Sequence, residues 1–322
     1  MKQTLDERFL ISPFLVFFIV HATQVGVGML GFQRPLMEDA GQDAWMAVLL
    51  AGLATHVLIW LMYRLLAYSP SGGDIVSLHK HYFGRWFGGV LSIGLLAYYA
   101  LAAFTVLQSY IEIIKVWMFP LMGAWQFSLI FLMLTYYVIS GGFRVVAGLC
   151  FWGVVIPLAT IFPMMAFAFE YAQYRNLLPV LDHSPTQILK AVNDMAFQYL
   201  GFEVLLMYYP FLKNAPSSQK WAHASNVLTI FLYLVVILIS IIFYNKEQIA
   251  HITWPTLTLA KIPEVPFIER MEYIVISIYV LVVFPNLVVA VWAMARVVKQ
   301  LFSIRQRRSL PVLIACLFIG TL

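Results

Sequence analysis

The sequence predicts an all-α integral membrane protein, an inverted repeat of five plus five transmembrane helices of which the last one or two are incomplete. Its 322 residues are 62% hydrophobic and only 11% charged, with a mean hydropathy of +0.85. That leaves too little polar surface to cover a soluble globule. A bilayer crossing needs about 20 apolar residues, and the chain holds eight such segments and the start of a ninth. The first and sixth segments each contain an internal glycine, a pattern typical of paired repeats.

The predicted spans are separated by polar, glycine-rich or proline-rich connections. Five helices carry the chain to the opposite side of the membrane, so a second set of five runs with inverted topology. We expect one transmembrane domain over 1–322, with a first repeat at about 1–175 and a second, truncated repeat at about 186–322. The run of 13 residues at 310–322 is too short to span a bilayer, so we expect the chain to stop before its native end. The eight complete segments are 11–32, 45–67, 88–117, 126–139, 145–169, 191–211, 226–244 and 274–297.

The positive charge is placed so that it orients the chain in a bilayer. The net charge is +5, and if the N-terminus is cytoplasmic, Lys and Arg are in excess in the cytoplasmic connections, as the positive-inside rule requires. These basic patches therefore need no nucleic-acid partner. Asp6, Glu7 and Arg8 precede an apolar run without a small-residue cleavage site, so we expect the first segment to be retained as a helix.

The first segment is interrupted by Gly26, Val27 and Gly28. Two interpretations are open at this point. Small residues allow close helix packing, or the helix unwinds and frees backbone N–H groups that a lined cavity or ligand must satisfy. The second interruption, at Leu200 and Gly201, falls where repeat symmetry requires it and favours unwinding. We then expect the broken first helix to present N–H groups to a carboxylate or another anion.

Glu203 follows Gly201 by two residues and is an ionisable group inside an apolar run. Such groups face a cavity or a partner, so Glu203 is a candidate proton or coupling site, or a partner for the ammonium group of an amino acid. The alternative is a structural hydrogen bond to a broken helix end.

Two weaker candidates lie on other segments. Tyr98 and Ala102 are one helical turn apart and share a face, although helix packing gives the same pattern. Pro285 and Asn286 interrupt the eighth segment, as a simple kink or as a polar wall of a site.

Catalytic constellations are absent from the sequence. It contains no hydrolytic triad, metal-ligand cluster or nucleotide-binding loop, and Cys150 and Cys316 lie far apart in apolar stretches. We expect neither enzymatic activity nor a bound metal or cofactor. Asp74 and the histidines near Lys80 are interpreted as a solvated loop.

Several dispersed motifs together resemble the B subunits of spore nutrient germinant receptors. They occur in the expected order across nearly the whole chain. They are Gly26-Val27-Gly28-Met29-Leu30, Arg34-Pro35, Ala40-Gly41-Gln42-Asp43-Ala44-Trp45, Leu178-Pro179-Val180-Leu181, Gly201-Phe202-Glu203-Val204, Tyr209-Pro210, Trp254-Pro255-Thr256-Leu257 and Ile268-Glu269-Arg270-Met271-Glu272.

The resemblance implies a LeuT-like fold of the amino acid, polyamine and organocation transporter type. It also implies residence in the spore inner membrane beside an A subunit and a lipoprotein C subunit. The nutrient pocket of this family would lie between helices one, three, six and eight. Carried over by motif, it would be lined by Gly26, Val27, Gly28, Tyr98, Ala102, Leu200, Gly201, Pro285 and Asn286.

Three functions follow from these observations. The leading hypothesis is a receptor subunit that binds a small germinant, most simply an amino acid, and passes a conformational change to partner subunits. The second is a proton- or sodium-coupled amino acid transporter, suggested by Glu203. The third is a scaffold that only assembles the receptor and binds no ligand.

Overall fold

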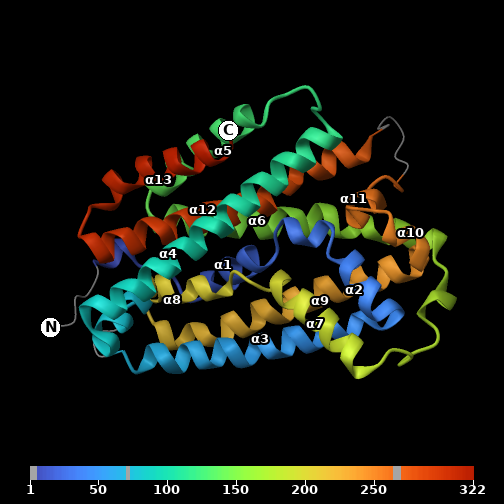
Figure 1. Cartoon of the computed structure of the whole chain (residues 1–322), viewed down its shortest axis with the longest axis horizontal. Coiled ribbons are helices and arrows are strands. Elements are labelled where there is room, and N and C mark those ends of the chain that lie inside the picture. Colours follow the sequence, from blue (N-terminus) through green and yellow to red (C-terminus); the bar gives the residue numbers. More distant parts are fainter. Residues whose placement is uncertain (1–5, 70–72, 264–269) are drawn as a thin grey trace.

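The computed structural model describes residues 6–69, 73–263 and 270–322. Within these ranges the secondary structure is helical, apart from an isolated β-bridge between Ile11 and Leu212. The long helices run roughly along one axis, and α2, α10 and α11 gather at one end of the molecule (Figure 1). The motif residues Ile268 and Glu269 lie outside the described residues.

The α-helices of the described ranges are α1 (Leu15–Gln24), α2 (Gln33–Ala40), α3 (Ala44–Ala67), α4 (Ile75–Trp117), α5 (Ala124–Ser140), α6 (Phe143–Met164), α7 (Pro185–Gln198), α8 (Leu205–Tyr208), α9 (Gln219–Phe243), α10 (Lys246–Ala250), α11 (Pro255–Leu259), α12 (Met271–Phe302) and α13 (Gln306–Gly320). The 3-10 helices are η1 (Glu7–Phe9), η2 (Val27–Leu30), η3 (Gly41–Asp43), η4 (Met165–Tyr171), η5 (Tyr174–Leu177), η6 (Phe202–Val204), η7 (Tyr209–Phe211) and η8 (Ala215–Ser218).

Five helical stretches are long and apolar enough to cross a membrane. In the described residues they are Gln33–Ala67, Ile75–Trp117, Phe143–Tyr171, Ala215–Phe243 and Met271–Phe302. The chain is therefore an integral membrane protein. The remaining predicted spans are shorter as single helices, because α1 and α7 end at the two interruptions and α5 has 17 residues.

Helix α1 lies inside the bundle, where it packs against α6, α9 and α12, while α4 packs along α12 and α3 packs against α7 and α9. A buried polar network joins α1 to α9. The amide Nε2 of Gln24 donates to Asn226 Oδ1 over 3.0 Å, and Thr229 Oγ1 donates to Gln24 Oε1 over 3.1 Å. Asn226 Nδ2 in turn donates to the carbonyl of Gly52 in α3 over 2.9 Å. These bonds satisfy groups that would be costly to leave unpaired at this depth.

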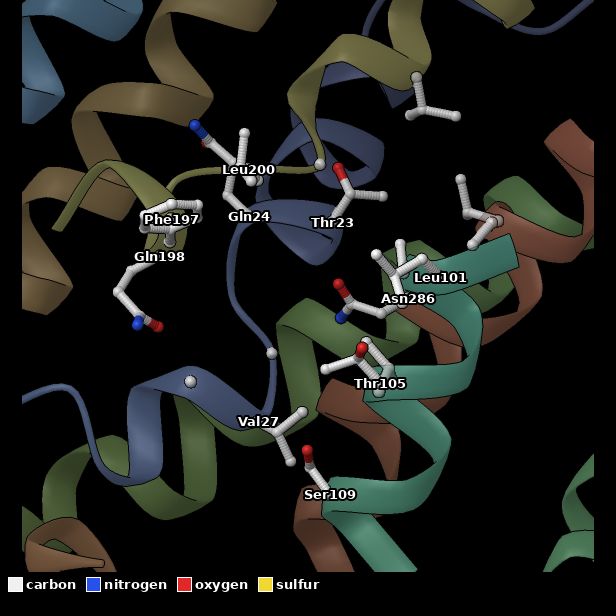
Figure 2. A pocket seen from close by; sticks show the side chains of 18 of the residues that line it. Thr23, Gln24, Val27, Leu101, Thr105, Ser109, Phe197, Gln198, Leu200 and Asn286 are labelled. Atoms are coloured by element: carbon white, nitrogen blue, oxygen red, sulfur yellow. The ribbon is translucent and has the colours of Figure 1, made fainter. Parts of the chain in front are cut away.

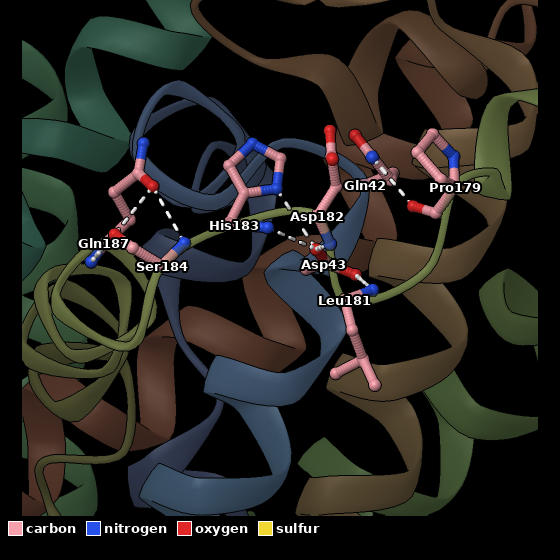
Figure 3. A network of polar contacts seen from close by, with 8 residues as sticks. All are labelled: Gln42, Asp43, Pro179, Leu181, Asp182, His183, Ser184 and Gln187. Carbon is pink, nitrogen blue, oxygen red and sulfur yellow. Dashed lines mark hydrogen bonds and ion pairs between the residues drawn. The ribbon is translucent and has the colours of Figure 1, made fainter.

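At the end of the molecule that carries α2, the Asp43 carboxylate binds the backbone of residues 181–183 (Figure 3). It accepts backbone N–H groups of Leu181, Asp182 and His183 over 2.8, 2.8 and 3.1 Å. Gln42 Nε2 also donates to the carbonyl of Pro179 over 2.8 Å. The long connection between the two predicted repeats is thereby tied to the junction of α2 and α3.

At the opposite end, Asp74 is fully buried, so the expectation of a solvated loop here is wrong. Asp74 Oδ1 accepts the backbone N–H of Ser77 and caps α4, whose first part is separated from the rest by a kink at Gly84. Asp74 Oδ2 lies 3.3 Å from Arg296 Nη2 and accepts Gln300 Nε2 over 2.7 Å. Both partners are in α12, more than 200 residues away, and local sequence carries no sign of them.

Candidate functional site

A cavity of about 640 Å³ lies at the centre of the bundle, where the two interrupted segments meet (Figure 2). Its walls come from the α1–η2 interruption, α4, the α7–η6 interruption and α12, with contributions from α9 and the segment before α11. The volume falls within the range of about 300–1,000 Å³ that is typical of small-molecule sites.

The structure brings together all but one of the predicted site residues. Those that line the cavity are Gly26, Val27, Gly28, Tyr98, Ala102, Leu200, Gly201, Glu203 and Asn286. Pro285 does not line it, and α12 continues through this residue instead of being interrupted. Gly153 of α6 makes room for this part of α12, because a Cβ there would lie 2.4 Å from the carbonyl oxygen of Leu281 and 2.7 Å from Pro285. Pro285 is therefore a packing residue between α12 and α6.

At the first interruption the carbonyl groups are satisfied by side chains from other helices. Helix α1 ends at Gln24, and Val25 and Gly26 have extended backbone. Asn286 Nδ2 donates to the carbonyls of Ala22 and Val25 over 2.7 and 3.0 Å. Tyr279 donates its hydroxyl to the carbonyl of Gly26 over 2.8 Å. The unwound backbone is thus held by α12.

Three backbone N–H groups of the same interruption, unlike its carbonyl groups, have no partner in the described part of the chain. Among the described residues, none accepts a hydrogen bond from the backbone N–H of Gly26, Val27 or Gly28. All three residues line the cavity. Unpaired donors at membrane depth cost several kcal/mol each unless water or a ligand satisfies them. The first interruption therefore supplies N–H donors that can form hydrogen bonds with an acceptor group of a ligand.

At the second interruption, the N–H of the glycine is bound by a nearby side chain. Gly201 has a φ of +116°, and its N–H donates to Glu203 Oε2 over 2.7 Å. Tyr98 donates its hydroxyl to Glu203 Oε1, also over 2.7 Å. Both carboxylate oxygens of Glu203 thus have donors within the protein, which supports the structural interpretation of this residue and links α4 to the second interruption.

The two interruptions touch each other directly. A Cβ at Gly201 would lie 2.1 Å from the carbonyl oxygen of Thr23, so only glycine allows this approach. Tyr233 of α9 donates its hydroxyl toward the carbonyls of Gln24 and Gln198, each over 3.2 Å. The two interruptions are therefore joined by direct packing and by a shared hydrogen-bond donor.

Sequence reasoning missed several cavity residues. Thr105 and Ser109 continue the face that starts with Tyr98 and Ala102, at spacings of three and four residues along α4, so extending the helical period would have found them. Thr253 and Trp254 close the cavity near α11, and no local signal identifies them. The other missed lining residues are Thr23, Gln24, Gly31, Tyr99, Leu101, Val106, Ile113, Phe197, Gln198, Val204, Tyr233, Val289 and Ala290.

The cavity offers backbone N–H groups, hydroxyls, amides and one internally bonded carboxylate. Within the described ranges there is no group of three or more His, Cys, Asp or Glu side chains that could hold a metal ion. Cys150 is buried in α6 and Cys316 is exposed in α13. This arrangement suits recognition of a small polar molecule.

A helical membrane protein in which two interrupted helices meet at a central cavity has the architecture of a secondary transporter. The chain belongs to the Spore_permease family of spore germination proteins, whose family model matches residues 10–322.

Individual relatives agree with this assignment. The chain is 41% identical over 319 residues to the spore germination protein GerQB of Bacillus cereus, covering 99% of this chain and 88% of that protein. It is 22% identical over 298 residues to spore germination protein A2 of Bacillus subtilis (strain 168), covering 92% of this chain and 81% of that protein.

Among solved structures, the chain resembles the crystal structure of MhsT in complex with L-phenylalanine. The TM-score is 0.62 at 14% sequence identity, and the match covers 97% of this chain and 79% of the MhsT chain. The predicted LeuT-like, all-α membrane fold is therefore confirmed, as is the resemblance to spore germination proteins.

Proposed function

We propose that this chain is the membrane subunit of a spore nutrient germinant receptor, which binds an amino acid in the central cavity and triggers germination. The observation that carries the proposal is that Gly26, Val27 and Gly28 line a cavity of about 640 Å³ and that their backbone N–H groups have no acceptor among the described residues. Backbone donors of this kind hold the carboxylate of a substrate in transporters with interrupted helices. The complex of MhsT with L-phenylalanine, which shares the fold, supports an amino acid as the ligand.

The proposal includes the setting of the protein. The chain resides in the spore inner membrane with its N-terminus on the core side, works beside A and C receptor subunits, and consists of two inverted repeats over about 1–175 and 186–322. Ligand binding favours one conformation of the bundle, by no more than the difference in its affinity for the two states. Because Tyr233 and Gly201 join the two interruptions, that difference is transmitted from one repeat to the other.

A second candidate is a proton- or sodium-coupled amino acid transporter. The fold shared with MhsT favours it, as does the half-buried carboxylate of Glu203 between α4 and the second interruption. Reconstitution separates the two functions. A receptor subunit binds radiolabelled amino acid without accumulating it in proteoliposomes, whereas a transporter accumulates it when an ion gradient is applied.

The proposed site is tested by Gly26→Leu. A Cβ at Gly26 lies 3.4 Å from the Asn286 amide, so a longer side chain must enter the cavity or displace Asn286. We expect dipicolinate release in response to amino acids to be lost while protein levels stay normal. Gly94→Leu is the matched control, because Gly94 is exposed on α4 and a Cβ there meets nothing within 4 Å. A fully responsive Gly26→Leu spore would disprove the assignment of the cavity.

A further inference from the structure

Three backbone carbonyls converge on a single nitrogen atom between α1 and α12. Asn286 Nδ2 lies 2.7 Å from the carbonyl oxygen of Ala22, 3.0 Å from that of Val25 and 3.0 Å from that of Val282. The first two oxygens belong to the end of α1 and its extension, and the third to the preceding turn of α12. Figure 2 shows the end of the Asn286 side chain directed from α12 toward the interruption.

Carbonyl oxygens that point at one position repel one another unless positive charge lies between them. Ion filters and the unwound helices of transporters resolve this by binding an alkali cation among such oxygens. Here the two hydrogens of a neutral amide occupy the position. The three acceptors also fix which end of the amide is nitrogen, because a carbonyl oxygen placed there would face three others.

The groups near this position provide no free negative charge that would balance a bound cation. In the described part of the chain, the carboxylate that lines the central cavity is Glu203, and both of its oxygens already accept hydrogen bonds. His21 of α1 makes its bond with Thr229 of α9, over 2.8 Å. The neighbouring carbonyl of Gly26 accepts the hydroxyl of Tyr279. A monovalent cation among these groups would have no free counter-charge, whereas the amide leaves the region neutral.

We infer that the Asn286 amide replaces a bound alkali cation between α1 and α12, so that the cavity is held in its binding geometry without a sodium ion. The fixed amide performs the structural task that a coupling ion performs in an ion-driven transporter, joining the interrupted helix to its neighbour. The inference goes beyond the proposed function, because it concerns the ion requirement of the fold, and it opposes the sodium-coupled alternative.

The first test needs no germinant, so it stays informative even if the proposed ligand is wrong. The intact protein, purified in detergent, is unfolded by heat in sodium chloride and in choline chloride at equal ionic strength. We expect the same Tm in both salts. A sodium-specific rise of about 3 °C or more, the size expected of roughly 1 kcal/mol of stabilisation in a protein of this length, would overturn the inference.

The second test converts the amide into an oxygen ligand. In Asn286→Asp the carboxylate faces three carbonyl oxygens, so we expect a lower Tm in choline chloride and recovery of about 3 °C or more in sodium or potassium chloride. Asn226→Asp is the matched control. Asn226 is an asparagine inside the same bundle, but its Nδ2 faces a single carbonyl and its Oδ1 accepts Gln24 Nε2, so its Tm should be equal in the two salts.

Two results of the second test would contradict the inference. One is an Asn286→Asp protein whose Tm is the same in all three salts, because the oxygens would then not form a cation cage. The other is an equal sodium effect in the Asn226→Asp control, which would make the effect unspecific. If Asn286→Asp does not fold in any salt, Asn286→Ala is measured in its place, and sodium should raise its Tm because the carbonyls of Ala22 and Val25 are then left without a donor. An Asn286→Ala protein with the same Tm in sodium and choline chloride would contradict the inference as well.

Discussion

The two interruptions of the bundle look alike in sequence but differ in how their polar groups are satisfied. At the first, side chains of α12 and α9 bind the free carbonyls, while the N–H groups of Gly26, Val27 and Gly28 have no acceptor among the described residues. At the second, Glu203 accepts the N–H of Gly201. The same kind of helix interruption therefore treats the N–H of its glycine in two different ways. The N–H of Gly26 in the first interruption has no acceptor among the described residues, whereas the N–H of Gly201 in the second is bound by Glu203.

The contact between the interruptions predicts the largest effect. In Gly201→Ala the new Cβ meets the carbonyl oxygen of Thr23 at 2.1 Å, and the φ of +116° is strained for any L side chain. Left-handed backbone and overpacking each cost about 1–3 kcal/mol, so we expect a loss of several kcal/mol and of the germination response. Thermal unfolding in detergent measures the loss.

Gly26→Ala is the natural comparison for that variant. Its Cβ makes ordinary contact with Asn286 at 3.4 Å, and Gly26 has a negative φ. We expect its unfolding free energy to fall by less than about 1 kcal/mol. If the two alanine variants have the same Tm, the close approach at Gly201 is not what joins the interruptions.

An intermediate effect is expected where α4 supports the second interruption. Tyr98→Phe removes the hydroxyl that donates to Glu203 Oε1, and a buried acceptor left without its donor costs about 1–3 kcal/mol. Tyr99→Phe is the matched control, because the buried Tyr99 hydroxyl has no hydrogen-bond partner in the described part of the chain. The difference in unfolding free energy between the two variants isolates the Glu203 bond. Equal values would mean that Glu203 does not depend on Tyr98.

A small effect on the germinant response is expected at Gly28 in the first interruption. A Cβ there would lie 1.8 Å from Gln198 Oε1, the far end of a flexible side chain. Gln198 can move aside, so we expect Gly28→Ala to raise the half-maximal germinant concentration by less than about tenfold. Adding Gln198→Ala should restore much of the response, because the clash is then removed. A double variant that responds as weakly as Gly28→Ala would place the cost in the backbone instead.

The sequence predicted this fold well because its signals are local. Apolar segments of about bilayer length marked the spans, and glycines marked both interruptions. Helix ends were less accurate, since α9 begins at Gln219, before the predicted apolar run at 226, in polar residues that hydropathy does not register. Pro285 was predicted to line the pocket, but it packs against Gly153 instead. Gly153 lies on another helix, so the sequence around Pro285 does not reveal this contact.

The site was predictable only where it depends on backbone or on helical spacing. The glycines, and Tyr98 with Ala102, could be found in that way. The double role of Tyr233, the pairing of Asp74 with Arg296 and the three acceptors of Asn286 join residues far apart in sequence. No periodicity in the chain encodes such contacts, because they arise only when the helices pack.

Under the proposed function, the α4 wall of the cavity has a consequence for how germinant preference can change over time. Leu101, Thr105 and Ser109 line the cavity, and none of them makes a side-chain hydrogen bond with another described residue. Their replacement alters the shape and polarity that a nutrient meets while the contacts between the interruptions stay intact. If the cavity binds the germinant as we propose, a lineage can acquire a new nutrient cue through a few substitutions on one helix, without changing the fold.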